Sequence, residues 1–105
     1  MTDVYLSEHA VKDRRGLDAH QNARLVALAK QLKRNVTLGD QIARDRIPKA
    51  LRLSYNATNL WRLELPGAWR VLYTIETRPG EEPMVSILRI LDHRAYDRLL
   101  GYKPS

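Results

Sequence analysis

The sequence predicts an α+β domain in which a small antiparallel sheet is covered by a helix on one face. Two runs, Leu60–Leu65 and Ala68–Glu76, alternate between apolar and polar residues, which is the pattern of half-buried strands. The turn Pro66-Gly67 joins them and favours an antiparallel hairpin. A third run, Met84–Leu91, is apolar on both faces, as expected of a central strand.

The first third of the chain predicts one short strand and two helices. Asp3–Leu6 is expected to form the strand, and Ser7–Arg15 one or two helical turns. Asp18 begins the main helix, because its side chain can cap the backbone at Gln21 in a variant of the capping box. Apolar residues then recur at helical spacing, and Asn35 is the expected stop. We expect this helix to cover one face of the sheet.

Residues 36–55 form a basic connector with mixed indications. Gly39-Asp40 is expected to open a short helical stretch, and Pro48 to end whatever precedes it. The basic residues of the connector are Arg44, Arg46, Lys49 and Arg52. A solvated loop and a loop that faces a substrate are equally compatible with this pattern.

The C-terminal part predicts a longer hairpin loop over residues 77–83 and a short final helix over Arg94–Leu100, which Gly101 ends. No repeat, low-complexity segment or domain boundary interrupts the sequence. With 105 residues there is room for one core, so we expect a single domain over residues 1–105.

Composition narrows the class of protein. Cysteine is absent, which excludes disulfides and thiolate metal sites. The three histidines, His9, His20 and His93, do not share a helix face at ligand spacing, so we expect no metal site. The sequence begins without the pattern of a signal peptide, and its longest apolar run is far too short to span a bilayer. We therefore expect a cytoplasmic protein that has no membrane partner.

The formal net charge of +6 suggests a polyanionic partner. Charge alone does not separate a nucleic acid from an acidic protein, and a basic surface that only promotes solubility is the third interpretation. Arginine outnumbers lysine, and its planar guanidinium pairs with phosphate through two hydrogen bonds. This balance favours phosphate contacts.

One group of residues suits a particular reaction, the metal-independent cleavage of RNA. In that reaction a 2′-hydroxyl attacks the neighbouring phosphate, so protons must move and a pentavalent phosphorane must be stabilised. Histidine exchanges protons near neutral pH, tyrosine can donate one, and arginine stabilises charge on the phosphoryl oxygens. The set consists of Arg62, Arg70, Arg89, His93, Arg94, Tyr96 and Tyr102. No cofactor is required.

Structural roles compete with this interpretation. A histidine at the end of a strand, such as His93, is more often structural than catalytic. Trp61 and Trp69 alternate with aliphatic residues and are better explained as core residues than as stacking platforms. For Arg89 the alternative is an ion pair, and for Tyr102 it is packing of the tail against the body. The acidic residues considered for Arg89 are Asp92, Glu64 and Glu76.

The order of these motifs resembles the RelE/ParE superfamily of toxins from bacterial and archaeal toxin–antitoxin systems. The matching segments are L-W-R-L-E-L at Leu60–Leu65, W-R-V-L-Y at Trp69–Tyr73 and I-L-R-I-L-D-H-R at Ile87–Arg94. The resemblance covers most of the chain and is clearest over residues 46–102. It implies a small antiparallel sheet with two or three N-terminal helices on one face and a short C-terminal helix.

The resemblance also implies an activity and its residues. Ribonuclease members cut messenger RNA in the ribosomal A site, and a cognate antitoxin neutralises them, so we expect an antitoxin, mRNA and the ribosome as partners and a toxin–antitoxin hetero-oligomer. Arg70 matches the arginine that contacts the scissile phosphate. The expected catalytic residues are Arg70, His93, Arg94 and Tyr96, and the expected substrate-binding residues are Lys49, Arg62, Arg46 and Glu64.

The sequence departs from the family pattern at two places. Glu64 stands where a basic active site would favour lysine, and it could act as a base, pair with Arg70 or weaken the activity. Neither Tyr96 nor Tyr102 aligns with the terminal tyrosine of the family. Two other functions therefore stay open: a ParE-like toxin that inhibits DNA gyrase by binding, and an inactive domain that binds RNA or a protein.

Overall fold

A five-stranded sheet in the order β1-β5-β4-β3-β2 organises the protein, whose computed structural model describes residues 2–102. Strand β1 runs parallel to β5, and all other neighbours are antiparallel. The strands are β1 (Val4–Leu6), β2 (Asp40–Gln41), β3 (Trp61–Leu65), β4 (Trp69–Glu76) and β5 (Met84–Leu91). The helices are α1 (Glu8–Arg14), α2 (Ala19–Leu32), α3 (Lys49–Tyr55) and α4 (His93–Leu100), with short 3-10 turns η1 (Arg44–Arg46) and η2 (Pro66–Ala68). The predicted α+β class is confirmed.

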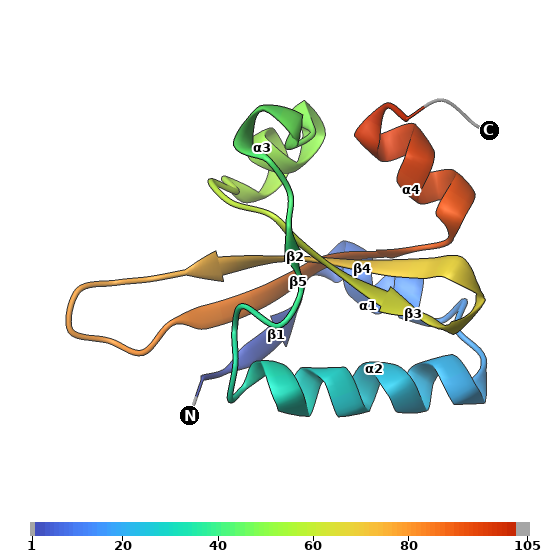
Figure 1. Ribbon diagram of the computed structural model, residues 1–105, viewed down its shortest axis with the longest axis horizontal. Coiled ribbons are helices and arrows are strands. Elements are labelled where there is room, and N and C mark those ends of the chain that lie inside the picture. Colours follow the sequence, from blue (N-terminus) through green and yellow to red (C-terminus); the bar gives the residue numbers. More distant parts are fainter. Residues whose placement is uncertain (1, 103–105) are drawn as a thin grey trace.

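Helix α2 covers one face of the sheet, as the sequence predicts (Figure 1). It begins at the predicted capping box: the Gln21 N–H donates to Asp18 Oδ1 at 2.7 Å, and the Asp18 N–H donates to Gln21 Oε1 at 3.0 Å. The side-chain amide of Gln21 also donates to the carbonyl of Pro66 at 2.8 Å, which ties the helix to the β3–β4 turn. The core under α2 includes Leu25, Leu28, Leu32, Leu63, Val71, Tyr73, Val85 and Ile87.

Helices α3 and α4 lie on the opposite face of the sheet (Figure 1). They cover a second apolar cluster, which includes Ile42, Ile47, Leu51, Leu60, Leu72, Leu88, Leu91 and Tyr96. Helix α4 ends as predicted at Gly101, whose φ of 77° is the left-handed conformation that glycine adopts readily. The two clusters place the middle of the sheet between apolar layers.

The prediction for the start of the connector is wrong. Gly39-Asp40 opens no helix, because Asp40 pairs with Arg62 and belongs to the edge strand β2. A Cβ atom at Gly39 would lie 2.5 Å from the carbonyl oxygen of Arg62, so glycine allows this close approach of two backbones. The helix of this region is α3, which begins directly after Pro48, where proline suits a helix start.

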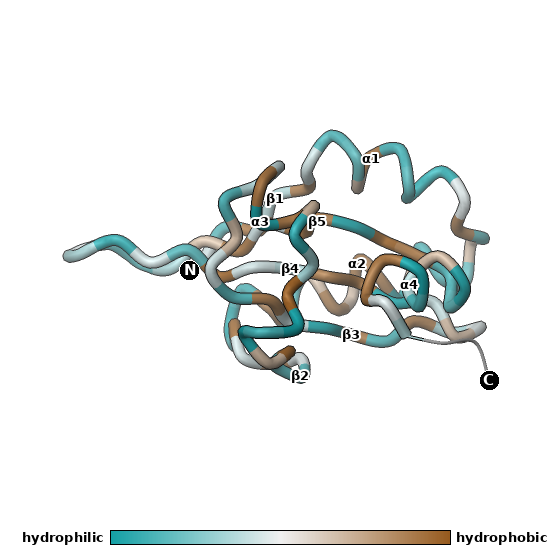
Figure 2. Tube along the Cα trace, turned by 90° about the horizontal axis from the view of Figure 1, so that it is seen from above, coloured by the Kyte–Doolittle hydropathy of each residue, from teal (hydrophilic) through white to brown (hydrophobic). Residues whose placement is uncertain are grey.

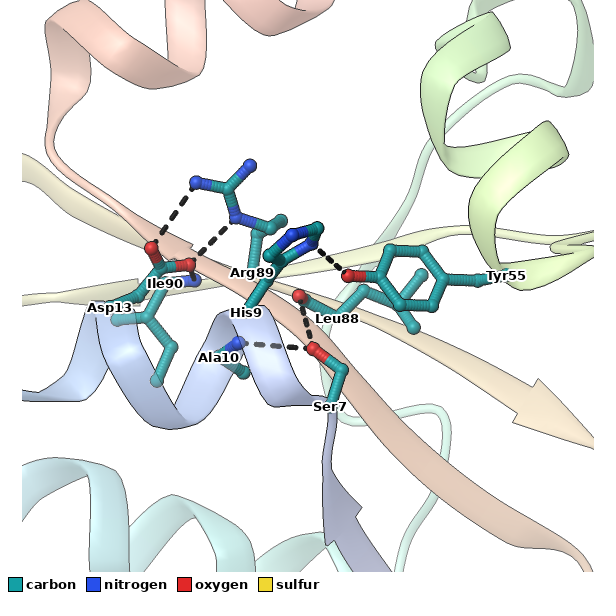
Figure 3. Close-up of polar contacts among 8 residues, drawn as sticks. All are labelled: Ser7, His9, Ala10, Asp13, Tyr55, Leu88, Arg89 and Ile90. Carbon is teal, nitrogen blue, oxygen red and sulfur yellow. Dashed lines mark hydrogen bonds and ion pairs between the residues drawn. The ribbon is translucent and has the colours of Figure 1, made fainter.

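Helix α1 continues along the edge of β5 where β1 ends (Figure 3). The Ser7 hydroxyl donates to the carbonyl of Leu88 at 2.8 Å, and Asp13 Oδ2 accepts the backbone N–H of Ile90 at 3.0 Å. Arg89 donates to both carboxylate oxygens of Asp13, at 2.7 and 3.2 Å. The ion pair expected for Arg89 therefore exists, but its partner is Asp13 of α1 rather than one of the three nearby acidic residues considered.

A β-bulge in β5 decides where Arg89 points. Leu72 pairs with Arg89 and Tyr73 with Ile87, so Leu88 is the extra residue. Since cross-strand partners share a face, Arg89 lies on the face of Leu72, which α3 and α4 cover. Figure 2 shows the apolar stretches of β4 and β5 inside the molecule and the hydrophilic β4–β5 loop projecting from it. Within residues 2–102, no helix has the length and apolar character needed to cross a membrane.

Candidate functional site

Arg62 and Arg70 come from neighbouring strands, β3 and β4, and lie on the α3–α4 face of the sheet. Arg62 pairs with Leu72 and Arg70 pairs with Glu64 across the hairpin, as the alternation of the two strands predicts. The Arg62 and Arg70 side chains are only 29% and 21% exposed. Two cations are therefore held half-buried, side by side, at this end of the sheet.

Tyr96 reaches these arginines from helix α4. Asp92 begins the helix by accepting the N–H of Ala95 at 2.8 Å, and this cap sets the direction in which Tyr96 projects. Arg62 Nη1 donates to the Tyr96 hydroxyl at 3.2 Å, and the Arg70 guanidinium carbon lies 5.7 Å from the centre of the Tyr96 ring. The tyrosine is buried, and it connects the two arginines.

Both arginines keep donors that no protein acceptor uses. The Nε atoms of Arg62 and Arg70 are buried, and neither has a hydrogen-bond partner among the described residues. Asp40 approaches Arg62 Nη2 at 3.4 Å and Glu64 approaches Arg70 Nε at 3.7 Å, but both carboxylates are largely exposed and the second distance is too long for a hydrogen bond. Buried donors without acceptors cost stability, and a bound group with acceptor oxygens would satisfy them.

The protonation state of Tyr96 follows from its surroundings. Burial raises the pKa of the Tyr96 phenol above its ordinary value, although the hydrogen bond from Arg62 works in the opposite direction. The same hydrogen bond is the main reason why the pKa of Arg62 is raised, against the effect of its own burial. At neutral pH the site therefore contains charged guanidinium groups beside a neutral hydroxyl that can still donate a proton.

A second aromatic contact extends the site toward the connector. Tyr102 lies 6.0 Å from Tyr96, ring centre to ring centre, and the Arg46 guanidinium carbon lies 5.8 Å from the centre of the Tyr102 ring. Arg46 is thus linked to the arginine pair through the rings of Tyr102 and Tyr96. Tyr102 therefore packs the end of the described chain against helix α4, which agrees with its predicted structural role rather than its predicted catalytic role.

The structure brings together five of the eight predicted site residues: Arg46, Arg62, Glu64, Arg70 and Tyr96. His93 and Arg94 lie exposed in the first turn of α4, and Lys49 lies exposed at the start of α3. None of these three has a hydrogen bond, ion pair or ring contact with Arg70 or Tyr96 within the described chain. Their roles stay predictions.

Sequence reasoning missed Asp40, which pairs with Arg62 from β2. The error about the start of the connector hid this residue, because a helix there would have directed its side chain elsewhere. The tryptophans are half-buried against the α2-side core, and Trp61 stacks on Tyr73 with ring centres 6.2 Å apart, which supports their interpretation as core residues. No group of three or more metal-ligating side chains occurs within residues 2–102.

The fold places the chain in a known structural class: it has a RelE-like α+β fold. The solved structure of the E. coli toxin RelE, a double mutant in the free state, matches 95% of this chain and 95% of its own length, with a TM-score of 0.58 and 12% sequence identity. No family model matches the sequence. No curated protein matches it either.

Proposed function

We propose that the protein is a RelE-type toxin that cleaves messenger RNA without a metal ion or cofactor. The observation that carries this proposal is the pair of half-buried arginines with unused buried Nε donors, joined by a neutral tyrosine. A phosphate has the oxygens that these donors lack, and guanidinium groups bind it with directional hydrogen bonds.

In the proposed reaction, the 2′-oxygen forms a bond to the neighbouring phosphorus and the bond from phosphorus to the 5′-oxygen breaks. Arg70 and Arg62 donate to the non-bridging oxygens, where negative charge accumulates in the transition state. Tyr96 gives its proton to the departing 5′-oxygen. A base takes the proton of the 2′-hydroxyl, and His93 is the first candidate because a histidine side chain can act as a general base.

Glu64 is the second candidate for the base. Its carboxylate is 64% exposed and lies beside Arg70, where a substrate could reach it. The peripheral cations Arg46, Lys49 and Arg94 would bind neighbouring phosphates, since each is exposed on the same side of the sheet as Arg70 or at its border. We infer further that the cellular substrate is ribosome-associated mRNA in the cytoplasm and that a cognate antitoxin neutralises the protein.

The test is induced expression followed by primer extension on cellular messages. The wild-type protein should arrest growth and produce codon-dependent cuts, which Arg70→Ala should abolish and which His93→Ala or Glu64→Gln should reduce according to which residue is the base. Arg24→Ala, on the exposed side of α2, is the matched control and should cut as the wild type does. Cleavage that persists in Arg70→Ala would refute the proposed site.

One observation favours an inactive binding domain as the second candidate. Glu64 places a negative charge next to Arg70 and so lowers the positive potential that a phosphate meets. In that case expression of the soluble protein would be harmless, whereas growth arrest with intact messages and damaged DNA would indicate the gyrase-inhibiting alternative.

A further inference from the structure

A cleft of about 550 Å³ opens on the α3–α4 face of the sheet, away from the arginine pair. It lies between the start of α1, the end of α3 and the distal parts of β4 and β5. Its polar wall includes Glu8, His9, Tyr55, Thr74, Glu76 and Ser86. This volume lies within the range of pockets that hold small organic ligands.

Two aromatic side chains from different helices form one end of the cleft. His9 of α1 and Tyr55 of α3 point toward one another over β5 (Figure 3). His9 Nδ1 is in hydrogen-bond contact with the Tyr55 hydroxyl, and the rings meet edge to face with centres 6.0 Å apart. This contact fixes the orientation of both rings, so the cleft has flat, preformed surfaces.

The polar groups of the cleft disfavour phosphate as its occupant. No lysine or arginine lines it within the described chain, and two carboxylates, Glu8 and Glu76, do. Arg78, from outside the lining, approaches Glu76 at 3.7 Å. The hydroxyls of Thr74 and Ser86 can donate or accept, whereas the carboxylates can only accept. The expected occupant is therefore a flat group with several N–H donors.

The cleft lies on the same face of the sheet as the proposed phosphate site. Thr74 and Glu76 lie on β4 four and six residues beyond Arg70 and on the same face, which corresponds to about 13–20 Å along the strand. Arg89, which the bulge directs to this face, lies on β5 opposite Leu72 and so between the two sites. A chain whose phosphate binds at Arg70 could thus follow this face toward His9 and Tyr55.

We propose that this cleft is a base-recognition pocket for a single-stranded RNA chain and that guanine is its preferred base, an inference that rests on the proposed function. The N1–H and N2–H donors of guanine lie side by side and match one carboxylate, whereas uracil offers a single N–H on the same edge. Proteins read unpaired RNA bases by this combination of edge hydrogen bonds and aromatic contacts. The arginine pair then positions the backbone, and the cleft specifies the sequence.

The test titrates the full-length protein with guanosine, with uridine and with inorganic phosphate, followed by amide chemical shifts in NMR spectra. Guanosine should shift the signals of Thr74, Glu76 and Ser86 and bind about tenfold more tightly than uridine. Glu76→Gln should remove that preference. Glu81→Gln, an equal change of charge in the exposed β4–β5 loop, should retain it. Equal binding of both nucleosides, or shifts confined to Arg62 and Arg70, would overturn the inference.

A cleavage assay on RNAs that differ only in guanine content separates this inference from the proposed function. Preferred cutting near guanine that Glu76→Gln abolishes, while total cleavage persists, supports the pocket. Cleavage that requires Arg70 but ignores base identity in both proteins contradicts the pocket and leaves the proposed function intact. Guanosine binding in the cleft of a protein that cleaves no RNA retains the base pocket and contradicts the nuclease.

Discussion

Replacing Arg70 by methionine should leave the stability of the protein nearly unchanged, although it removes a half-buried charge. The folded chain would lose the contact with the Tyr96 ring, about 0.5–1 kcal/mol, and the hydrogen bond that Arg70 Nη1 donates to the carbonyl of Trp69 at 3.3 Å, about 0.5–1.5 kcal/mol. It would also lose a long ion pair with the exposed Glu64, at most about 0.5 kcal/mol. The change also removes a buried Nε donor that has no acceptor, which costs the folded state about 1–3 kcal/mol. The free energy of unfolding should therefore stay within about 1 kcal/mol of the wild-type value.

Arg89→Met is the matched comparison, because Arg89 is also a half-buried arginine of the central sheet. It is paired with a carboxylate: its removal breaks two hydrogen bonds of 2.7 and 3.2 Å to Asp13, whose side chain is only 15% exposed. Among the described residues, the carboxylate would then keep only the N–H of Ile90. Loss of one partner of such a pair should cost about 2–4 kcal/mol, less than for a fully buried pair because Arg89 itself is 29% exposed.

Thermal and urea unfolding at pH 7, followed by circular dichroism, measure both changes. A difference of about 2 kcal/mol between the variants corresponds to about 8–16 °C in Tm for a domain of this size. Arg70→Met should also abolish RNA cleavage in the same preparations. If Arg70→Met destabilises the protein as much as Arg89→Met does, the unused donors of the site carry no cost and the argument for a ligand site fails.

Three further outcomes are expected. Tyr96→Phe should slow RNA cleavage by about 100-fold or more in a single-turnover assay. It should lower the free energy of unfolding by only about 1–2 kcal/mol. An unchanged cleavage rate would exclude Tyr96 as the proton donor. Burial raises the pKa of both Tyr73 and Tyr96 in the folded protein. As the pH rises, these tyrosines therefore ionise first in the unfolded chain. Their contribution to the free energy of unfolding should be complete below about pH 10 and should be lost as the pH rises through the folded-state pKa values. Urea unfolding between about pH 8 and 11 checks this, and Tyr96→Phe should flatten the fall. Gly39→Ala should destabilise the fold by about 1–3 kcal/mol, because the added Cβ would collide with the carbonyl oxygen of Arg62. Thermal unfolding measures this change, and a variant with the Tm of the wild type would contradict the close approach of the two backbones.

Local patterns predicted the parts of the fold that depend on neighbouring residues. The capping box at Asp18, the alternation of β3 and β4 and the stop at Gly101 each depend on residues a few positions apart, and each is present. The same alternation is sufficient to place Arg62 and Arg70 on one face of the hairpin. The short helix α3 escaped prediction because only seven residues form it and its sequence, KALRLSY, carries no side-chain cap.

Contacts between distant segments could not be predicted in the same way. Arg89 and Asp13 are 76 positions apart, and His9 and Tyr55 are 46 apart, so no spacing rule connects them. The bulge at Leu88 also changes which residues of β5 share a face, and its sequence contains no glycine or proline to mark it. The arginine pair was therefore predictable, whereas the cleft beside His9 depends on contacts that only the folded chain brings together.

The parallel pairing of β1 with β5 affects the order in which the protein folds. The β3–β4 hairpin joins residues that are close in sequence, and such hairpins form in about 1–10 μs. Val4 pairs with Val85, by contrast, so this contact closes a loop that spans most of the chain and must form late. Until β1 and α1 dock, the N–H and C=O groups along one side of β5 stay unpaired and can recruit a strand from another molecule. A partly folded chain, rather than the finished fold, is therefore the state in which this protein is most prone to aggregate.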